Sequence, residues 1–453
     1  MTKTVCGVLA SIVICPTIIT AGATAQPLPG ASAFVPPSAQ QAPEGDVMLE
    51  VMIDGEPRLI DLRPSNIRRD GFKLLMGVNT GDFTNDRGRV MPVDPAPSGV
   101  YRGTTDLGEL VAADRDETGW NIFISARGVY RVDDTAGRRA GPPPVATLVE
   151  SMSNGLPAGA VCGADDLDAP VHRFVGEAVD RANLPERASA AATDLRPGEY
   201  RVVELGIDCD LYFYERHASS IDLALAEVER VINAVNLVYE RDVNISFRLT
   251  GVVVRVSIND DPYIIDRPLQ RAIRVMEDVW QSGDIDIPHD IGHLFVGRNF
   301  NGPAIAVGVT TSVCTPRAYG ATQVVYDFVE NFKLVSHEFA HNFSAPHCMG
   351  DECYIMCYSL NACAGIGDPH FGESTKEYIR NFTATLDCLD IEGGPSCPAD
   401  IGEPQGVLDI ADVVAFLTAF GQGDPIADLG APQGVFDIAD VVAFTSFFGQ
   451  GCP

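Results

Sequence analysis

At 453 residues the chain is long enough for two or three domains, and its 46% hydrophobic content excludes a disordered protein. Its 62 acidic residues against 32 basic ones give a formal charge of -30. Such a charge argues against nucleic acids and anionic membranes as partners.

Residues 1–25 are typical of a signal peptide. Lys3 supplies the positive start, an apolar run follows over 5–19, and Ala-Thr-Ala at 23–25 is a small-residue cleavage site. The run is too short to span a membrane comfortably, and no later run is long and apolar enough. We therefore expect an exported protein, secreted or associated with the cell surface, without a transmembrane segment.

Residues 26–180 are expected to form a β-rich region. After a leader rich in Pro, Ala, Gln and Ser, short runs of alternating apolar and polar residues recur between 47 and 134, separated by turn residues. A loop with Cys162 follows. Residues 181–199 are small and polar, as in an exposed linker where a protease could easily cut the chain.

Strands and helices alternate along residues 200–390. Strands are predicted over 201–208 and 245–256, and a helix is predicted over 219–240 with Ser220 as its N-cap. A shorter helix is expected around 275–280. The alternation predicts an α/β domain with a cleft above one edge strand.

The segment 335–347, Val-Ser-His-Glu-Phe-Ala-His-Asn-Phe-Ser-Ala-Pro-His, indicates a metal site. His337 and His341 lie one helical turn apart, so both imidazoles can bind one metal. His347 lies too far along to share that helix face, so the chain must turn to bring it back. The helix would bury its opposite, apolar side, which carries Phe332, Val335, Phe339 and Phe343.

Three protein ligands and one water are the open coordination of a catalytic zinc, whereas a structural zinc is closed by four protein ligands. Zinc lowers the pKa of its water, and Glu338 lies where it can take the proton as general base. The predicted chemistry is hydrolysis of a peptide bond. His289 and His293 are expected to be structural, because the metal already has three ligands.

This segment resembles the metzincin signature, and His-Asn-Phe-x-x-Pro-His is most similar to its reprolysin, or adamalysin, branch. The resemblance implies a zinc endopeptidase with a twisted, mostly parallel sheet, helices and a zinc cleft. It places Met356 under the histidines as a hydrophobic floor. Two positions depart from the family: Ser344 replaces a glycine at a turn where positive φ is useful, and Cys348 replaces a common aspartate.

The same family resemblance gives the N-terminal region a role. Tyr101-Arg102-Gly103 and the later run over 128–132 resemble the prodomain that precedes reprolysin catalytic domains. In many metzincin zymogens a prodomain thiolate fills the open zinc position, and Cys162 is the candidate here. The alternative is a disulfide, with Cys209 as the candidate partner.

Cysteine usage agrees with export. Two of the twelve cysteines, Cys6 and Cys15, leave with the signal peptide, and a cluster lies between 348 and 388. In an exported chain this predicts disulfides, with a second zinc site as the alternative. The family resemblance implies that Cys314 pairs with Cys388.

Residues 397–453 contain an internal repeat, in which 399–421 recur as 427–449. Each copy is an acid-rich loop followed by a predicted helix of about three turns. The repeat resembles the dockerin-type loop-helix, which implies a docking partner. Gly402, Pro404 and Gln405 stand where the calcium pattern has Asp or Asn. The remaining candidate Ca2+ ligands are Asp400, Asp409, Asp412, Asp428, Asp437 and Asp440. The alternative is a small helical pair closed by Cys397 and Cys452.

The sequence thus predicts a secreted zinc metalloendopeptidase, made as a zymogen, that hydrolyses extracellular proteins or peptides. The alternative is a catalytically weak or inactive protease-like protein that binds or anchors through its C-terminal repeats. Intact ligands and an intact Glu338 argue against that alternative. A third hypothesis, hydrolysis of non-peptide amides, is disfavoured by the reprolysin-like surroundings.

Overall fold

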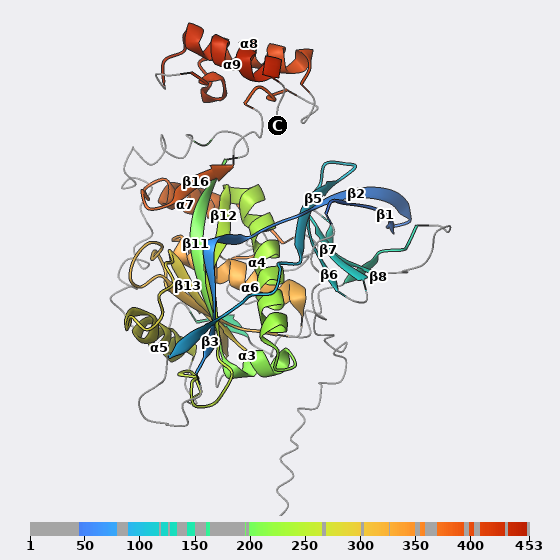
Figure 1. The fold of residues 1–453 in the computed structure, drawn as a ribbon. Coiled ribbons are helices and arrows are strands. Elements are labelled where there is room, and N and C mark those ends of the chain that lie inside the picture. Colours follow the sequence, from blue (N-terminus) through green and yellow to red (C-terminus); the bar gives the residue numbers. More distant parts are fainter. Residues whose placement is uncertain are drawn as a thin grey trace, which may run out of the picture. The chain divides into compact units, whose positions relative to one another are not determined.

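The computed structural model describes residues 45–78, 89–116, 119–125, 127–133, 143–149, 160–163, 195, 199–264, 269–299, 303–325, 327–348, 354–357, 369–393, 398–402, 408–430 and 434–450 (Figure 1). The predicted signal peptide and nearly all of the 181–199 linker lie outside these residues. Within the described parts the strands form two sheets, and no helix is long and apolar enough to cross a membrane.

The first sheet is an antiparallel meander built from the N-terminal region. Its strands, in spatial order, are β1 (Val47–Ile53), β2 (Glu56–Pro64), β5 (Val100–Thr105), β6 (Leu110–Asp116), β7 (Gly119–Ile124), β8 (Gly128–Asp133) and β9 (Thr147–Val149). Side chains alternate between the two faces of each strand, and one face buries a core that includes Val51, Ile60 and Trp120. Strands are thus present where alternating runs predicted them.

The second sheet is mostly parallel and belongs to the α/β region. Its central strands are β15 (Tyr319–Gln323), β13 (Ile291–Val296), β11 (Glu199–Cys209) and β12 (Ile245–Val254), all mutually parallel. β14 (Ala304–Gly308) runs antiparallel to β15, and β16 (Asp390–Gly393) pairs with the start of β11. The predicted α/β architecture is therefore present, and it is compatible with a metalloprotease domain.

Three described strands of the N-terminal region lie in this second sheet. β3 (Arg68–Gly77) pairs in parallel with β12, and β4 (Val90–Val93) pairs with β3. On the other side, β10 (Val161–Cys162) pairs in parallel with β14. The region predicted as β-rich therefore contributes strands to both sheets.

The helices follow the predicted positions. α4 (Ile221–Val243) begins after Ser220, whose hydroxyl accepts a hydrogen bond from the backbone N–H of Leu223, as an N-cap should. α3 (Leu211–Arg216), α5 (Leu269–Gln281), α6 (Phe328–Asn342) and α7 (Glu373–Thr383) complete the helices of this region. α4 is largely buried, and its Asn233 amide donates to the backbone carbonyls of Tyr101 and Ala113 in the first sheet.

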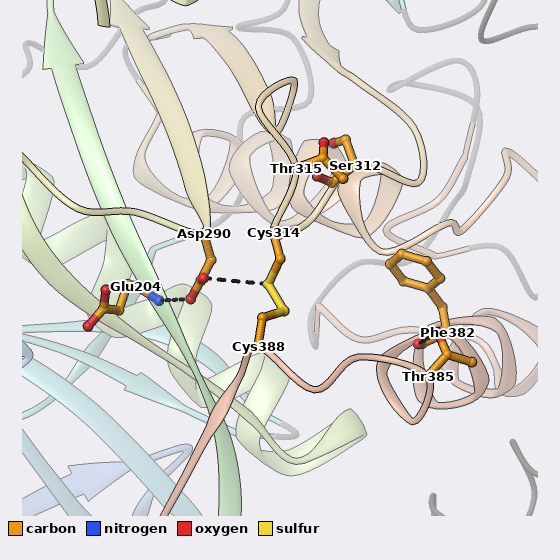
Figure 2. Close-up of a disulfide and its surroundings, with 8 residues drawn as sticks. All are labelled: Glu204, Asp290, Ser312, Cys314, Thr315, Phe382, Thr385 and Cys388. Atoms are coloured by element: carbon orange, nitrogen blue, oxygen red, sulfur yellow. Dashed lines mark hydrogen bonds between the residues drawn. A yellow bond between two sulfur atoms is a disulfide. The ribbon is translucent and has the colours of Figure 1, made fainter. Parts of the chain in front are cut away.

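The disulfide implied by the family resemblance is present. Cys314 and Cys388 are joined, with their Cα atoms 6.4 Å apart (Figure 2). Oδ1 of Asp290 lies 3.5 Å from the Cys314 sulfur, which in a disulfide has no proton to donate, so the contact is one of packing. Cys348 and Cys357 are each disulfide-bonded as well, so neither can contribute a thiolate to a second zinc site, and Cys353 and Cys363 lie outside the described residues.

The C-terminal repeat forms two similar helices, α8 (Ile410–Gln422) and α9 (Ile438–Gln450), joined through the 3-10 turn η2 (Pro425–Ala427). Phe416 and Phe444 stack with ring centroids 4.1 Å apart. The Asp412 carboxylate accepts hydrogen bonds from the backbone N–H groups of Ile401, Gly402 and Asp409. This carboxylate and backbone amides therefore hold the first loop.

The second loop repeats this arrangement. Asp440 accepts from the N–H groups of Gly430 and Asp437, and Asp428 accepts from Gly434. A Cβ at Gly430 would meet Ala439 at 2.6 Å, so the loop needs glycine there. Gly402 is the corresponding glycine of the first loop, and a Cβ there would meet Ala411 equally closely. Both glycines thus serve packing of loop on helix.

Asp114 on β6 is a buried carboxylate that faces α4. It is 5% exposed and accepts a hydrogen bond of 2.8 Å from the side-chain amide of Asn121. Burial raises its pKa from 3.8 to about 6, although Arg230 on α4 acts in the opposite direction. The folded state therefore binds this proton more tightly than the unfolded chain does.

Asp114→Asn should raise the melting temperature at neutral pH. Because the folded pKa lies above the unfolded one, the wild type loses stability relative to the variant as pH rises from about 4 to about 6. Above that window the difference stays constant, at up to roughly 3 kcal/mol. Thermal unfolding of both proteins near pH 4 and near pH 8 checks this. A variant that is less stable near pH 8 would contradict it.

Candidate metal centre

The helix α6 presents two histidines of the predicted site. It begins after Asp327, whose carboxylate accepts from the N–H of Glu330. The apolar face predicted for it is fully buried, with Phe332, Val335, Phe339 and Phe343 all at 0% exposure. The helix is therefore fixed on its core side, and His337 and His341 lie where the i, i+4 spacing places them.

The three predicted histidines converge on one point. The Nε2 atoms of His337, His341 and His347 are each 3.1 Å from the other two. Nδ1 of His337 lies 2.7 Å from the carbonyl oxygen of Ile355, and Nδ1 of His341 lies 2.8 Å from that of Ala345. A carbonyl only accepts, so both Nδ1 atoms carry the proton and both Nε2 lone pairs face the common point. This donor set fits a divalent zinc ion.

A tight turn after α6 brings His347 back to its partners. The N–H of Ser344 donates to the carbonyl of His341, and Ser344 has a φ of +72°. The strain expected from serine in place of the family's glycine is therefore real at this position. The Ser344 hydroxyl lies 3.1 Å from that of Thr311, which has a positive φ of its own.

Met356 lies fully buried in the large hydrophobic core cluster. It directly follows Ile355, the residue whose carbonyl binds His337, and its own carbonyl accepts from the N–H of Cys348. The segment 354–357 thus contacts both the first histidine and the residue that follows the third.

Glu338 is enclosed beside the histidines. The residue is 0% exposed, and burial raises the pKa of its carboxyl well above the usual range. Its Oε1 atom has no hydrogen-bond partner among the described residues, and its Oε2 atom lies 3.5 Å from the Cys162 sulfur. A buried carboxylate with a free oxygen next to a metal site is equipped to accept a proton from a water.

Cys162 lies in the same cluster. Its sulfur is 3.4 Å from Nε2 of His341, and the four candidate ligand atoms of Cys162 and the three histidines all lie within 4.8 Å of one another. Backbone bonds hold the segment in place: Val161 N–H donates to Pro303 and Gly163 N–H to Ala306. Neither Cys162 nor Cys209 forms a disulfide, so the alternative of a disulfide between them is wrong.

Several positioning residues were not predicted. The Tyr239 hydroxyl donates to the carbonyl of Ser336 at 2.7 Å, and the Asn342 amide donates to the carbonyl of Val309 at 2.9 Å. Asn342 sits inside the histidine segment and could have been noticed there. Tyr239 lies on α4, far away in the sequence, and has no local signal.

The other candidate residues lie elsewhere. His289 bonds the hydroxyl of Tyr319 and His293 that of Thr322, so both are structural, as expected. Cys314 and Cys388 form their disulfide beside Asp290, whose carboxylate accepts from the N–H of Glu204 (Figure 2). The C-terminal aspartates belong to the repeat described above.

Ser344→Gly and Ser344→Ala should separate backbone strain from the hydroxyl contact. Both variants lose the contact with Thr311, but only glycine adopts the positive φ without cost. Ser344→Gly should therefore be more stable than Ser344→Ala by about 1 kcal/mol. Denaturant midpoints of the two variants measure the difference. Equal stability, or a more stable alanine variant, would show that the turn is unstrained.

Comparison with known proteins agrees with this geometry. Residues 199–381 match a family model described as Reprolysin_5, Metallo-peptidase family M12. The chain is 25% identical to the snake venom metalloproteinase atroxlysin-1 of Bothrops atrox, over 44% of this chain and 97% of that protein. It is 23% identical to a zinc metalloproteinase-disintegrin-like protein of Cerberus rynchops, over 49% of this chain and 35% of that protein.

One solved structure, titled "Structure of a chaperone-substrate complex", shares a TM-score of 0.30 and 13% identity over 41% of this chain and 35% of that one. A likeness at that TM-score says nothing about this fold. The family model and the two venom proteins, together with the histidine cluster, support a reprolysin-type zinc metalloprotease.

Proposed function

We propose that the chain is an exported zinc metalloendopeptidase. It would be synthesised as an inactive zymogen and activated when Cys162 leaves the metal site. One observation carries the proposal: three imidazole Nε2 atoms, a buried carboxylate and a thiol meet at a single point. The family match supports the metalloprotease activity, and the predicted signal peptide and the likeness to a snake venom metalloproteinase support secretion.

Each residue has a defined part in the reaction. His337, His341 and His347 would hold the metal through Nε2, and the carbonyls of Ile355 and Ala345 keep two of the rings oriented. Zinc, when bound, supplies Lewis-acid chemistry that makes a water more acidic and polarises a carbonyl. Glu338 accepts the proton of the attacking water and can return it to the leaving amine.

The strand β14 gives a place for the substrate. In the structure its outer edge pairs with β10 (Val161–Cys162), which is the last strand of the α/β sheet on that side. An extended peptide can use the same backbone groups once this segment has left. This supports extended segments of proteins or peptides as substrates, rather than non-peptide amides.

Cys162 would keep the enzyme silent. A thiolate is a strong zinc ligand, and this thiol lies on the open side of the three histidines, where a water would otherwise bind. It also lies beside Glu338, so it separates the base from any substrate. A cut in the 181–199 linker would be the first step of activation.

The C-terminal repeat is proposed as a docking module. α8 and α9 present corresponding apolar side chains to solvent, with Ile410, Val414, Ile438 and Val442 all more than half exposed. Calcium binding by this repeat is a separate proposal. The carboxylates that could bind the ion already accept hydrogen bonds from backbone amides, which argues against it. This module would localise the enzyme. It would serve equally well in the alternative function, in which the protein binds a partner and has no protease activity.

Glu338→Gln should strongly reduce the hydrolysis of an unfolded protein such as casein by the activated enzyme, while zinc stays bound. Loss of a general base lowers the rate by roughly a hundredfold to ten-thousandfold, and a zinc chelator should abolish the rest. Glu373→Gln, an exposed position on α7, is the matched control and should keep full activity. Unchanged hydrolysis by Glu338→Gln with one zinc bound would exclude this mechanism.

Cys162→Ala should make the uncut chain active. The uncut wild type should not hydrolyse casein, whereas the uncut variant should do so from the start, because the fourth ligand is gone. Cys209→Ala, which removes the other cysteine that forms no disulfide among the described residues, is the control and should remain inactive. A silent Cys162→Ala chain with zinc bound would show that something else blocks the cleft.

A further inference from the structure

We propose that the N-terminal region stays bound after activation, so that the active enzyme is a two-chain complex and not a free catalytic domain. The proposal rests on the proposed function above, because it concerns what happens to the chain that carries Cys162. It separates two parts of that chain: residues 45–149, which would be retained, and the segment around Cys162, which would be released.

The N-terminal region and the α/β region share one sheet. β3 pairs with β12 in a parallel register that runs from Arg68 opposite Leu249 to Met76 opposite Val254. Ile67 and Leu74 are 1% and 2% exposed and belong to the large core of the α/β region, and Leu75 belongs to its second core. Without β3, strand β12 would become an open edge with apolar residues exposed beside it, which native proteins avoid.

Ion pairs also join the N-terminal region to helix α4. Glu229 on α4 is 0% exposed, and its carboxylate is bound by Arg68 of β3 at 2.5 Å. Arg102 of β5 pairs with Glu240 of α4 and donates to the carbonyl of Asn233 at 3.0 Å. Loss of the N-terminal region would remove the cation that pairs with Glu229, and breaking a buried ion pair is costly.

A second group of acids depends on the same region. Arg69 of β3 forms ion pairs with Glu204, Asp390 and Glu392, which come from both ends of the α/β region. The chain as a whole carries 62 acidic residues against 32 basic ones. Arg69 therefore joins three carboxylates that would otherwise repel one another.

The N-terminal region also packs against the apolar side of the metal-binding helix α6. Phe123 of β7 packs on Phe332 of α6 with ring centroids 5.0 Å apart. Val100, Ala112 and Val129 of the first sheet belong to the same core cluster as Phe339 on α6. The sheet of the N-terminal region thus covers apolar residues that support the helix of His337 and His341.

The segment with Cys162 is attached in a different way. Its contacts include backbone bonds to Pro303 and Ala306, the approach of Cys162 to His341, and an apolar cluster that Ala160 shares with Ile305 and Leu334. A single cut in the 181–199 linker leaves this segment joined to the retained region through Val149. Release of the thiol therefore needs a second break, between Val149 and Ala160.

The experiment uses the full chain with recognition sequences for a highly sequence-specific protease inserted in 181–199 alone, or in both 181–199 and 150–159. The folded protein is cut, and the fragments are followed by size-exclusion chromatography and mass spectrometry. After either treatment the fragment with residues 45–149 should elute together with the catalytic fragment. Casein hydrolysis should appear only after the double cut.

Paired variants test the contacts. Arg68→Ala combined with Arg102→Ala should speed loss of the N-terminal fragment by at least about tenfold, because each removes a cation from a buried or half-buried carboxylate. Arg63→Ala is the control, since the ion pair of Arg63 is with Asp61 on its own strand, and it should leave retention unchanged. Equal retention in the double variant would contradict the charge argument.

The outcomes distinguish this proposal from the proposed function. If an active catalytic fragment elutes alone after cutting, retention is wrong and the protease activity stands. If the fragments elute together but the doubly cut complex with zinc bound hydrolyses nothing, retention stands and the protease activity is wrong. Full hydrolysis after the single cut would overturn the requirement for a second break.

Discussion

The metal centre depends on three imidazole nitrogens that must stay unprotonated while they lie within 3.1 Å of one another. Burial disfavours the charged forms of His337 and His341 and lowers the pKa of both rings, whereas His347 is half-buried. Carbonyls of Ile355 and Ala345 hold two of the Nδ1 protons and so turn the Nε2 lone pairs inward. The same burial raises the pKa of Glu338, so one enclosed environment prepares both the ligands and the base.

This requirement explains features that lie far from the histidines. The Ile355 carbonyl can reach His337 only if the segment 354–357 is fixed, and Cys357, its last residue, is disulfide-bonded, as is Cys348. The positive φ of Ser344 closes the turn that returns His347. The core face of α6 rests on aromatic residues from the N-terminal region as well as from its own domain. Rigidity at the metal is therefore assembled from several separate segments.

Much of the metal site could be predicted because its spacing follows from helix geometry, and the i, i+4 pair needs no tertiary information. The Cys314–Cys388 bridge came from the family resemblance alone. The sequence could not show that β3 leaves its neighbours to pair with β12, because non-local strand pairing has no local signature. Nor could it decide the state of Cys162, which depends on a distance to His341. The backbone carbonyls around the histidines carry no side-chain signal at all.

The most direct test of the account is X-ray absorption spectroscopy at the zinc edge on the intact, uncut chain loaded with one zinc. The account predicts three nitrogen neighbours at about 2.0–2.1 Å and one sulfur neighbour at about 2.3 Å, with the sulfur lost in Cys162→Ala. A zinc with only nitrogen and oxygen neighbours in the intact chain would contradict the role of Cys162. Failure to bind zinc at all would contradict the metal centre itself.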